Sequence, residues 1–343
     1  MSNDQPTRPS ETTPLLPGNY VEPASAPKPD DEDPLPPQIP LARVAITVLA
    51  VWIGVFLGAL DTTVISTLLA PISNSFSSFT SISWIATGYL IANAALQPLF
   101  GRLTDIYGRR SLLVLCNVLF GVGNLMCGLA TNQYAMVAGR VVQGAGGGGL
   151  MTISSIVATD LVPLRQRGIL QGMGNIAYGS GAALGGVYGG YVSDKIGWRW
   201  AFLIQIPFVV VSAIMVFVLV KIPVRRTAEA RHRRIDYWGC LTLLAGMVLL
   251  LLGLNSGGNI VPWTHPLVLI CLPLSAVFLV AFLVVEKWYA KEPVIPVHLL
   301  ADRTVLSACL TNWFMVMSLF CLVISPLTTS YPNGGFSPWL MRE

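Results

Sequence analysis

Residues 101–110 read Gly-Arg-Leu-Thr-Asp-Ile-Tyr-Gly-Arg-Arg, and this charged segment separates two long uncharged stretches. Neither Thr62–Phe100, before it, nor Ser111–Gly139, after it, contains Asp, Glu, Lys or Arg. A helix that crosses the ~30 Å hydrocarbon core of a bilayer needs about 20 apolar residues. Each stretch is long enough for such a helix, so residues 101–110 are predicted to form a loop between two membrane spans.

The same pattern continues along the chain, in which 53% of the residues are hydrophobic and 11% are charged. Soluble domains contain about 25% charged residues, so this composition excludes a soluble enzyme and a nucleic-acid-binding domain. The sequence therefore predicts an all-α polytopic membrane protein with the lipid bilayer as its solvent. Its nine predicted spans are 44–69, 82–100, 111–130, 134–158, 168–192, 200–221, 237–254, 267–285 and 304–325.

The segments outside the spans differ in composition. Residues 1–42 are rich in proline and acidic residues and are predicted to be a disordered cytosolic tail. Most of the 21 Lys and Arg residues lie on the side of this tail, which the positive-inside rule assigns to the cytosol. That side includes a basic loop at 223–236 and a second loop at 286–303. Residues 326–343 are predicted to be an atypical tail without a span pattern.

The segment 101–110 resembles the signature G-x-L-x-D-x-x-G-R-R of the major facilitator superfamily, and every fixed position matches. Gly101 and Gly108 would permit tight turns and close approach of helices. Asp105 would cap the N-terminus of a neighbouring helix, and Arg109 and Arg110 would face the cytosol. The alternative is an ordinary positive-inside loop, which explains the arginines but not the glycines and the aspartate at this spacing.

Asp160 closes the fourth predicted span on the same cytosolic side. The family resemblance implies that Asp105, Arg109 and Asp160 form a charge relay that breaks and reforms as a gate moves. The alternative is three solvated loop charges, which would contribute little.

Arg140 lies within the fourth predicted span and requires a partner there, because an isolated charge in a membrane is costly. Asp61 is the only carboxylate inside the nine predicted spans. It lies ~12 Å from the far membrane face and Arg140 ~9 Å from it, at 1.5 Å per residue. Arg140 and Gln143 resemble the family element R-x-x-Q-G-x-G. The three residues are candidates for substrate and proton coupling, and the alternative is a purely structural ion pair.

The fifth predicted span is rich in glycine. Gly181, Gly185 and Gly189 recur every four residues, with Gly186 beside them, and this spacing predicts close helix packing. The stretch resembles the family's antiporter element G-P-x-x-G-G, although Ala182 replaces the proline. The glycine run at 143–149 lacks the Lys-Ser/Thr of a phosphate-binding loop. No metal site, cofactor or catalytic constellation is predicted, so the chain is predicted not to be an enzyme.

The stretch Leu60-Asp-Thr-Thr-Val-Ile-Ser66 resembles the L-D-x-T-V-V-N element of the fourteen-span drug:proton antiporters. Within that branch the chain is similar to fungal vacuolar basic amino-acid transporters and multidrug facilitators. The resemblance implies a six-helix bundle at 43–222 and two extra helices at 237–285. The span 304–325 would be the first helix of a second bundle that is incomplete, so the chain is predicted to be a truncated transporter.

The resemblance implies antiport of protons against basic amino acids or cationic and hydrophobic drugs. Glu11, Leu15 and Leu16 fit an acidic dileucine sorting signal, which would bind a sorting adaptor and direct the protein to the vacuolar membrane. Two alternatives stay open. One is multidrug efflux at the plasma membrane, and the other is a half-transporter that does not transport and acts as a membrane partner.

Overall fold

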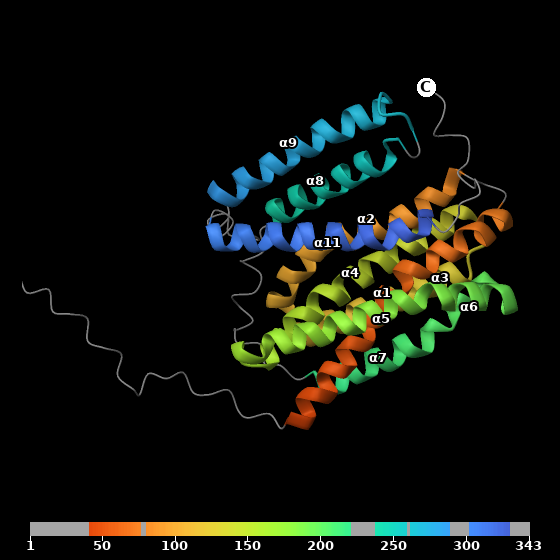
Figure 1. Ribbon diagram of the computed structural model, residues 1–343. Coiled ribbons are helices and arrows are strands. Elements are labelled where there is room, and N and C mark those ends of the chain that lie inside the picture. Colours follow the sequence, from red (N-terminus) through yellow and green to blue (C-terminus); the bar gives the residue numbers. More distant parts are fainter. Residues whose placement is uncertain (1–40, 77–79, 221–236, 259–260, 289–301, 330–343) are drawn as a thin grey trace, which may run out of the picture. The chain divides into compact units, whose positions relative to one another are not determined.

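The computed structural model describes residues 41–76, 80–220, 237–258, 261–288 and 302–329. These residues are helical apart from short connections (Figure 1), and a helix lies at each of the nine predicted spans. The helices are α1 Leu41–Phe76, α2 Thr80–Tyr107, α3 Arg109–Gly128, α4 Gln133–Leu161, α5 Leu164–Ile196, α6 Trp198–Leu203, α7 Gln205–Leu219, α8 Tyr237–Ser256, α9 Pro266–Trp288 and α11 Arg303–Thr329.

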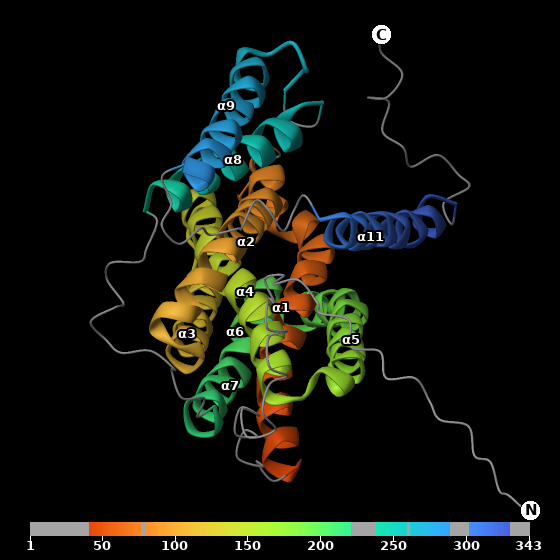
Figure 2. The same cartoon turned by 90° about the vertical axis from the view of Figure 1, so that its left-hand side faces the viewer.

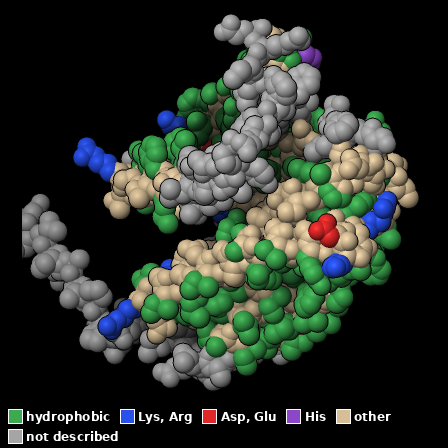
Figure 3. Space-filling view, turned by 45° about the vertical axis from the view of Figure 1, so that its right-hand side comes forward, with side chains coloured by type: hydrophobic (Ala, Val, Ile, Leu, Met, Phe, Trp, Pro, Cys, Tyr) green, Lys and Arg blue, Asp and Glu red, His purple; other side chains and the backbone are tan. Residues whose placement is uncertain are grey.

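Six membrane-capable segments, judged by length and apolar composition, occur in the described residues. They correspond to α1, α3, α4, α6 with α7, α8 and α9. Of the other predicted spans, α2 is more polar because it contains residues such as Asn93 and Gln97, and α5 is rich in glycine. In α11 the side chains are described only as far as Ser318. Figure 3 shows that hydrophobic side chains cover much of one face and that charged side chains are sparse on it.

The sixth predicted span is two helices rather than one. α6 ends at Leu203 and α7 begins at Gln205, with Ile204 between them. Pro207 has no backbone N–H to donate to the carbonyl group of Leu203 and its ring crowds that carbonyl, so a continuous helix is disfavoured here. The sequence analysis missed this break because it considered only the apolar length of the segment.

α4 packs between α2 and α3, as Figure 2 shows for the arrangement of these helices. Its glycine run makes this possible. A Cβ atom at Gly144 or Gly148 would overlap the backbone of α2, and one at Gly146 would overlap the backbone of α3 near Phe120. Small residues that let backbones approach in this way are the usual basis of helix association in membranes. The glycines therefore fix α4 at the centre of the first bundle.

α5 packs against α1 through three of the four glycines predicted to lie in the contact. A Cβ atom at Gly181, Gly185 or Gly189 would overlap the backbone or a side chain of α1. Gly186 departs from the prediction, because a Cβ atom there would meet no atom of the described residues within 4 Å. Successive residues of an α-helix are rotated by about 100° around its axis. Gly186 therefore points away from α1, although its neighbour Gly185 faces it.

α8 and α9 pack against each other, and α8 also contacts α2. A hydrogen bond of 2.6 Å joins the Thr87 hydroxyl group on α2 to Asn255 Oδ1 on α8. The two helices that follow the first bundle are thus attached to it through a polar contact.

Candidate functional site

Asp61 on α1 and Arg140 on α4 form an ion pair in the interior of the bundle. Arg140 Nη1 lies 2.5 Å from Asp61 Oδ2, and both side chains are 0% exposed. The two residues are 79 positions apart in sequence, and the packing of α1 against α4 brings their side chains into contact. The structure therefore places together the two charges that the sequence analysis selected by depth.

Gln143 lies beside this pair and extends it to α3. Arg140 Nη1 also donates to Gln143 Oε1 at 2.6 Å, and Gln143 Nε2 donates to Asn124 Oδ1 at 3.0 Å. Asn124 in turn donates to the carbonyl group of Phe120. The sequence analysis did not identify Asn124. A polar asparagine within an apolar span could have marked it as a candidate.

Tyr89 and Ile85 on α2 enclose Arg140 from another side. The guanidinium carbon lies 4.3 Å from the centroid of the Tyr89 ring, and Arg140 Nε donates to the carbonyl oxygen of Ile85 at 3.4 Å. The Tyr89 hydroxyl group donates to the carbonyl oxygen of Gly58 on α1. Tyr89 was also missed from the sequence, where an aromatic residue in a span does not stand out.

The network does not use every polar atom of its two charges. Asp61 Oδ1 and Arg140 Nη2 are buried and form no hydrogen bond with the described residues. A buried ion pair is costly to desolvate and holds only while both charges are present. Apart from Asp61, Arg140 contacts Gln143, Ile85 and Tyr89.

A second group of charges lies where α2, α3 and α4 end or begin. Arg109 Nη2 lies 3.0 Å from Asp105 Oδ1, and Arg109 Nε lies 2.9 Å from Asp160 Oδ2. Arg109 also donates to the carbonyl oxygen of Thr104. The three residues of the predicted relay are thus in contact, and Arg109 is the least exposed of them at 23%.

The segment 101–110 is mostly helical, which corrects the predicted loop. Residues 101–107 are the last turns of α2, and α3 begins at Arg109. Only Gly108 separates the helices, with φ 90° and ψ 152°, a conformation that favours glycine. Because the joint needs a single left-handed residue, no longer loop is required.

The structure gives the contacts of three further residues of this segment. A Cβ atom at Gly101 would lie 3.7 Å from Thr152, an ordinary contact, so close helix approach does not require glycine there. Asp105 pairs with Arg109 one turn further along the chain. Arg110 stacks on the ring of Phe217 on α7, 4.0 Å from its centroid.

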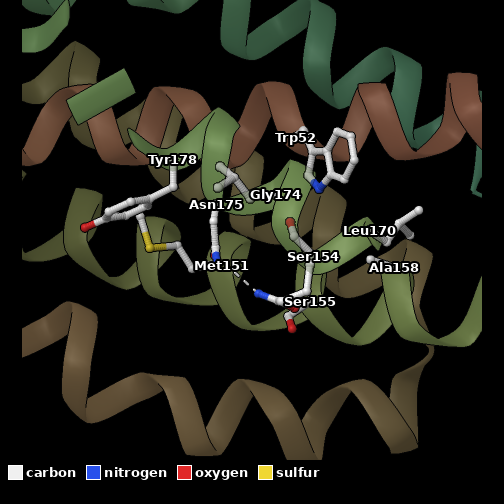
Figure 4. Close-up of a pocket in the computed structure, with 11 residues that line it drawn as sticks. Trp52, Met151, Ser154, Ser155, Ala158, Leu170, Gly174, Asn175 and Tyr178 are labelled. Atoms are coloured by element: carbon white, nitrogen blue, oxygen red, sulfur yellow. Dashed lines mark hydrogen bonds between the residues drawn. The ribbon is translucent and has the colours of Figure 1, made fainter. Parts of the chain in front are cut away.

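A pocket of about 160 Å³ opens between α1, α4 and α5, and Figure 4 shows its lining. It contains no charged side chain. The residues that line it are Trp52, Val55, Met151, Ser154, Ser155, Ala158, Leu170, Gln171, Gly174, Asn175 and Tyr178. The sequence analysis did not identify it, because these residues come from three helices and form no motif.

Two further findings concern the predicted candidates. α9 extends to Trp288, beyond the predicted end at 285, so Glu286 is a second buried carboxylate within a helix, at 4% exposure. Glu11, Leu15 and Leu16 lie outside the described residues, as does the basic loop 223–236. Within the described ranges, no group of His, Cys, Asp and Glu side chains is placed to hold a metal ion.

Comparison with known proteins gives a family match. The Major Facilitator Superfamily matches residues 51–339 of the chain. Multidrug resistance protein fnx1 of Schizosaccharomyces pombe is 42% identical over 80% of this chain and 52% of its own length. The vacuolar membrane amino acid uptake transporter fnx2 of the same organism is 37% identical over 79% of this chain and 47% of its own length. Efflux pump dotC of Dothistroma septosporum is 36% identical over 80% of this chain and 48% of its own length. The chain thus spans about half the length of these curated relatives.

Proposed function

The chain belongs to the Major Facilitator Superfamily, and from that premise we propose that it serves proton-coupled antiport of basic amino acids or of cationic and hydrophobic drugs. It is an integral multi-pass membrane protein of a transporter family, not an enzyme. Its relatives include proteins described as a vacuolar amino acid uptake transporter and as multidrug efflux proteins, which supports both substrate classes.

The observation that carries the proposal is the buried pair Asp61–Arg140. A proton that binds Asp61 neutralises the carboxylate, and the contact with Arg140 loosens. Loss of the proton restores the contact and draws α1 and α4 together again. Because each partner is fully buried, the free energy of either charge depends strongly on the state of the other. This coupling of protonation to helix contact is what an antiporter requires.

The Arg109 group supports the same proposal at the ends of the helices. Arg109 joins α2, α3 and α4 through Asp105, Asp160 and the Thr104 carbonyl group. These contacts are partly exposed, so each contributes little to stability. Weak contacts of this kind can break and reform in every cycle, as a gate requires.

The test is uptake driven by a pH gradient into membrane vesicles. Because the chain spans about half the length of its relatives, it is assayed alone and joined to the remaining half of the relative fnx1. We expect Asp61→Asn to abolish uptake of labelled lysine or of a lipophilic dye. The matched control is Asp194→Asn, which changes an exposed aspartate of α5. Gradient-driven uptake that survives Asp61→Asn would show that the pair is structural only.

The proposed location is the vacuolar membrane. The supporting observations are the motif of Glu11, Leu15 and Leu16 and the vacuolar description of the relative fnx2. A tagged Leu15→Ala, Leu16→Ala variant is expected to move to the plasma membrane. An unchanged distribution between fractionated membranes would refute the sorting role and leave plasma-membrane efflux as the alternative.

A further inference from the structure

α2 lies between two other helices at the level of the ion pair. Ile85 and Tyr89 of α2 contact Arg140 of α4. Between them in sequence, Thr87 donates a hydrogen bond of 2.6 Å to Asn255 Oδ1 of α8. We propose that Asn255 is a positioning residue for the ion pair: through Thr87 it keeps this part of α2 in contact with Arg140. The consequence for antiport rests on the proposed function.

Thr87 and the two residues that contact Arg140 lie on opposite sides of α2. At about 100° per residue, Ile85 and Tyr89 lie about 40° apart around the helix axis, and Thr87 lies about 160° from each. Thr87 and Tyr89 are both buried. α2 therefore packs against α4 on one side and against α8 on the other, as Figure 1 shows. A shift of the helix at Thr87 would also move the contacts of Arg140.

A proline separates the part of α2 that contacts Arg140 from the rest of the helix. Pro98 has no backbone N–H to donate to the carbonyl group of Ala94, and its ring crowds that carbonyl group. Sharp kinks in helices are commonly located at proline. The position of the preceding half of α2 therefore depends on the helices packed against it, and α8 is the helix that bonds to it at Thr87.

α8 is itself closely packed against α9. A Cβ atom at Gly246 would lie 3.0 Å from Leu279 Cδ2, and one at Gly253 would lie 2.9 Å from Leu272 Cδ2, both closer than an ordinary contact. Gly253 precedes Asn255 by two residues, so the close packing continues to the level of the hydrogen bond. Hydrogen bonds between side chains of neighbouring helices contribute to helix association in membranes. α8 and α9 together therefore support α2 on the side away from Arg140.

Two native cysteines of α3 can report on this arrangement. Cys127 Sγ lies 3.8 Å from Gln143 Oε1, the oxygen atom that also accepts from Arg140. Cys127 shares a core cluster with Ile85, whereas Cys116 belongs to a separate cluster. Both cysteines are 0% exposed, so each thiol reacts with a reagent only when its surroundings open. Their rates therefore distinguish opening near Arg140 from loosening of the whole bundle.

The experiment measures the rate at which each cysteine reacts with N-ethylmaleimide, a small reagent that enters membranes. The full chain is labelled in lipid nanodiscs, and mass spectrometry identifies the modified residues. Thr87→Val removes the hydrogen-bond donor with little change in size, and Asn255→Leu removes the acceptor. We expect either variant to raise the rate at Cys127 by about three- to twentyfold, which corresponds to the loss of one hydrogen bond between membrane helices. The rate at Cys116 should stay unchanged.

Three further variants show whether the hydrogen bond itself is responsible. Thr87→Ser keeps the hydroxyl group and should react like the unchanged chain. Ser256→Ala is the matched control on α8, because the Ser256 hydroxyl group is buried and forms no hydrogen bond with the described residues. The double variant Thr87→Val, Asn255→Leu should react no faster than either single variant, since both substitutions remove the same bond.

Three outcomes would overturn the proposal. Equal acceleration at Cys127 and Cys116 would show that the hydrogen bond stabilises the fold without positioning the ion pair. An unchanged rate at Cys127 in Thr87→Val and Asn255→Leu would show that α8 does not act on the network. A double variant in which the two accelerations multiply would show that Thr87 and Asn255 act separately.

This proposal and the proposed function fail in different ways, because the labelling needs neither a gradient nor a substrate. If Thr87→Val exposes Cys127 selectively but Asp61→Asn transports normally, the coupling role is wrong and the positioning role of Asn255 stands. If Asp61→Asn abolishes transport but Thr87→Val leaves Cys127 as unreactive as before, the positioning role is wrong and the coupling role stands.

Discussion

At the level of single residues, the side chain that most clearly sets the geometry of the ion pair is Asn124. It accepts a hydrogen bond from Gln143 and so orients the Gln143 amide group with its oxygen toward Arg140. A rotated amide would present its NH₂ group to the guanidinium group, which has no acceptor. Asn124 therefore acts on the pair through Gln143, without touching either charge in the contacts observed.

Replacement of Asn124 tests this role. Asn124→Ala leaves Gln143 Nε2 without its buried partner, so we expect the free energy of unfolding to fall by about 1–3 kcal/mol. Asn117→Ala is the matched control: it changes another buried asparagine of α3 that also donates to a carbonyl group one turn back. Asn117 Oδ1 has no hydrogen-bond partner in the described residues, so its loss should cost less. Thermal unfolding of the purified chain gives both values, and equal losses would contradict the role of Asn124.

At the level of helices, α1 packs against one side of α5, which carries Gly185, and Gly186 lies outside that contact. Gly185→Val would force the added methyl groups into the backbone of α1 near Leu60, whereas Gly186→Val projects into open space. Overpacking typically costs 1–3 kcal/mol, so we expect Gly185→Val to lower the midpoint of thermal unfolding clearly. Gly186→Val should leave it nearly unchanged. Similar losses for both variants would contradict the observed packing of α5.

The Arg109 group allows a prediction that separates transport from stability. Arg109→Gln removes contacts between three helices that are each partly exposed, so the free energy of unfolding should change by no more than about 1 kcal/mol. We expect the rate of gradient-driven uptake to fall, because the gate loses its central cation. Arg110→Gln, which changes the neighbour stacked on Phe217, is the control. An uptake rate that falls equally in both variants would refute a specific role for Arg109.

The sequence predicts the positions of the helices better than it predicts their joints. Uncharged length placed a helix at each of the nine spans, because composition alone decides whether a segment can lie in a membrane. The break at Ile204 and the single-residue joint at Gly108 depend on local backbone geometry. Asp61 and Arg140 could be paired from the sequence because both lie at a similar distance from the far membrane face. Asn124, Tyr89 and the pocket were missed because they are defined by which faces of different helices meet.

At the level of the whole molecule, the distribution of positive charge predicts the orientation in the membrane. Cysteines introduced at Thr227 and Asn259, in a chain without its native cysteines, should react with an impermeant reagent from opposite sides. The basic residues on the side of Thr227 assign that side to the cytosol. Labelling of both positions from one side would refute the predicted orientation of α8 between them.

The glycine run of α4 also bears on how the chain is made. α4 is the least hydrophobic of the six membrane-capable helices, and glycine is a poor helix former. It emerges from the ribosome after α2 and α3, whose backbones are shaped to receive Gly144, Gly146 and Gly148. Transfer into lipid therefore favours this segment less than it favours the other five. We therefore expect α2 and α3, which precede α4 in synthesis, to assist its insertion by offering surfaces that fit its glycines.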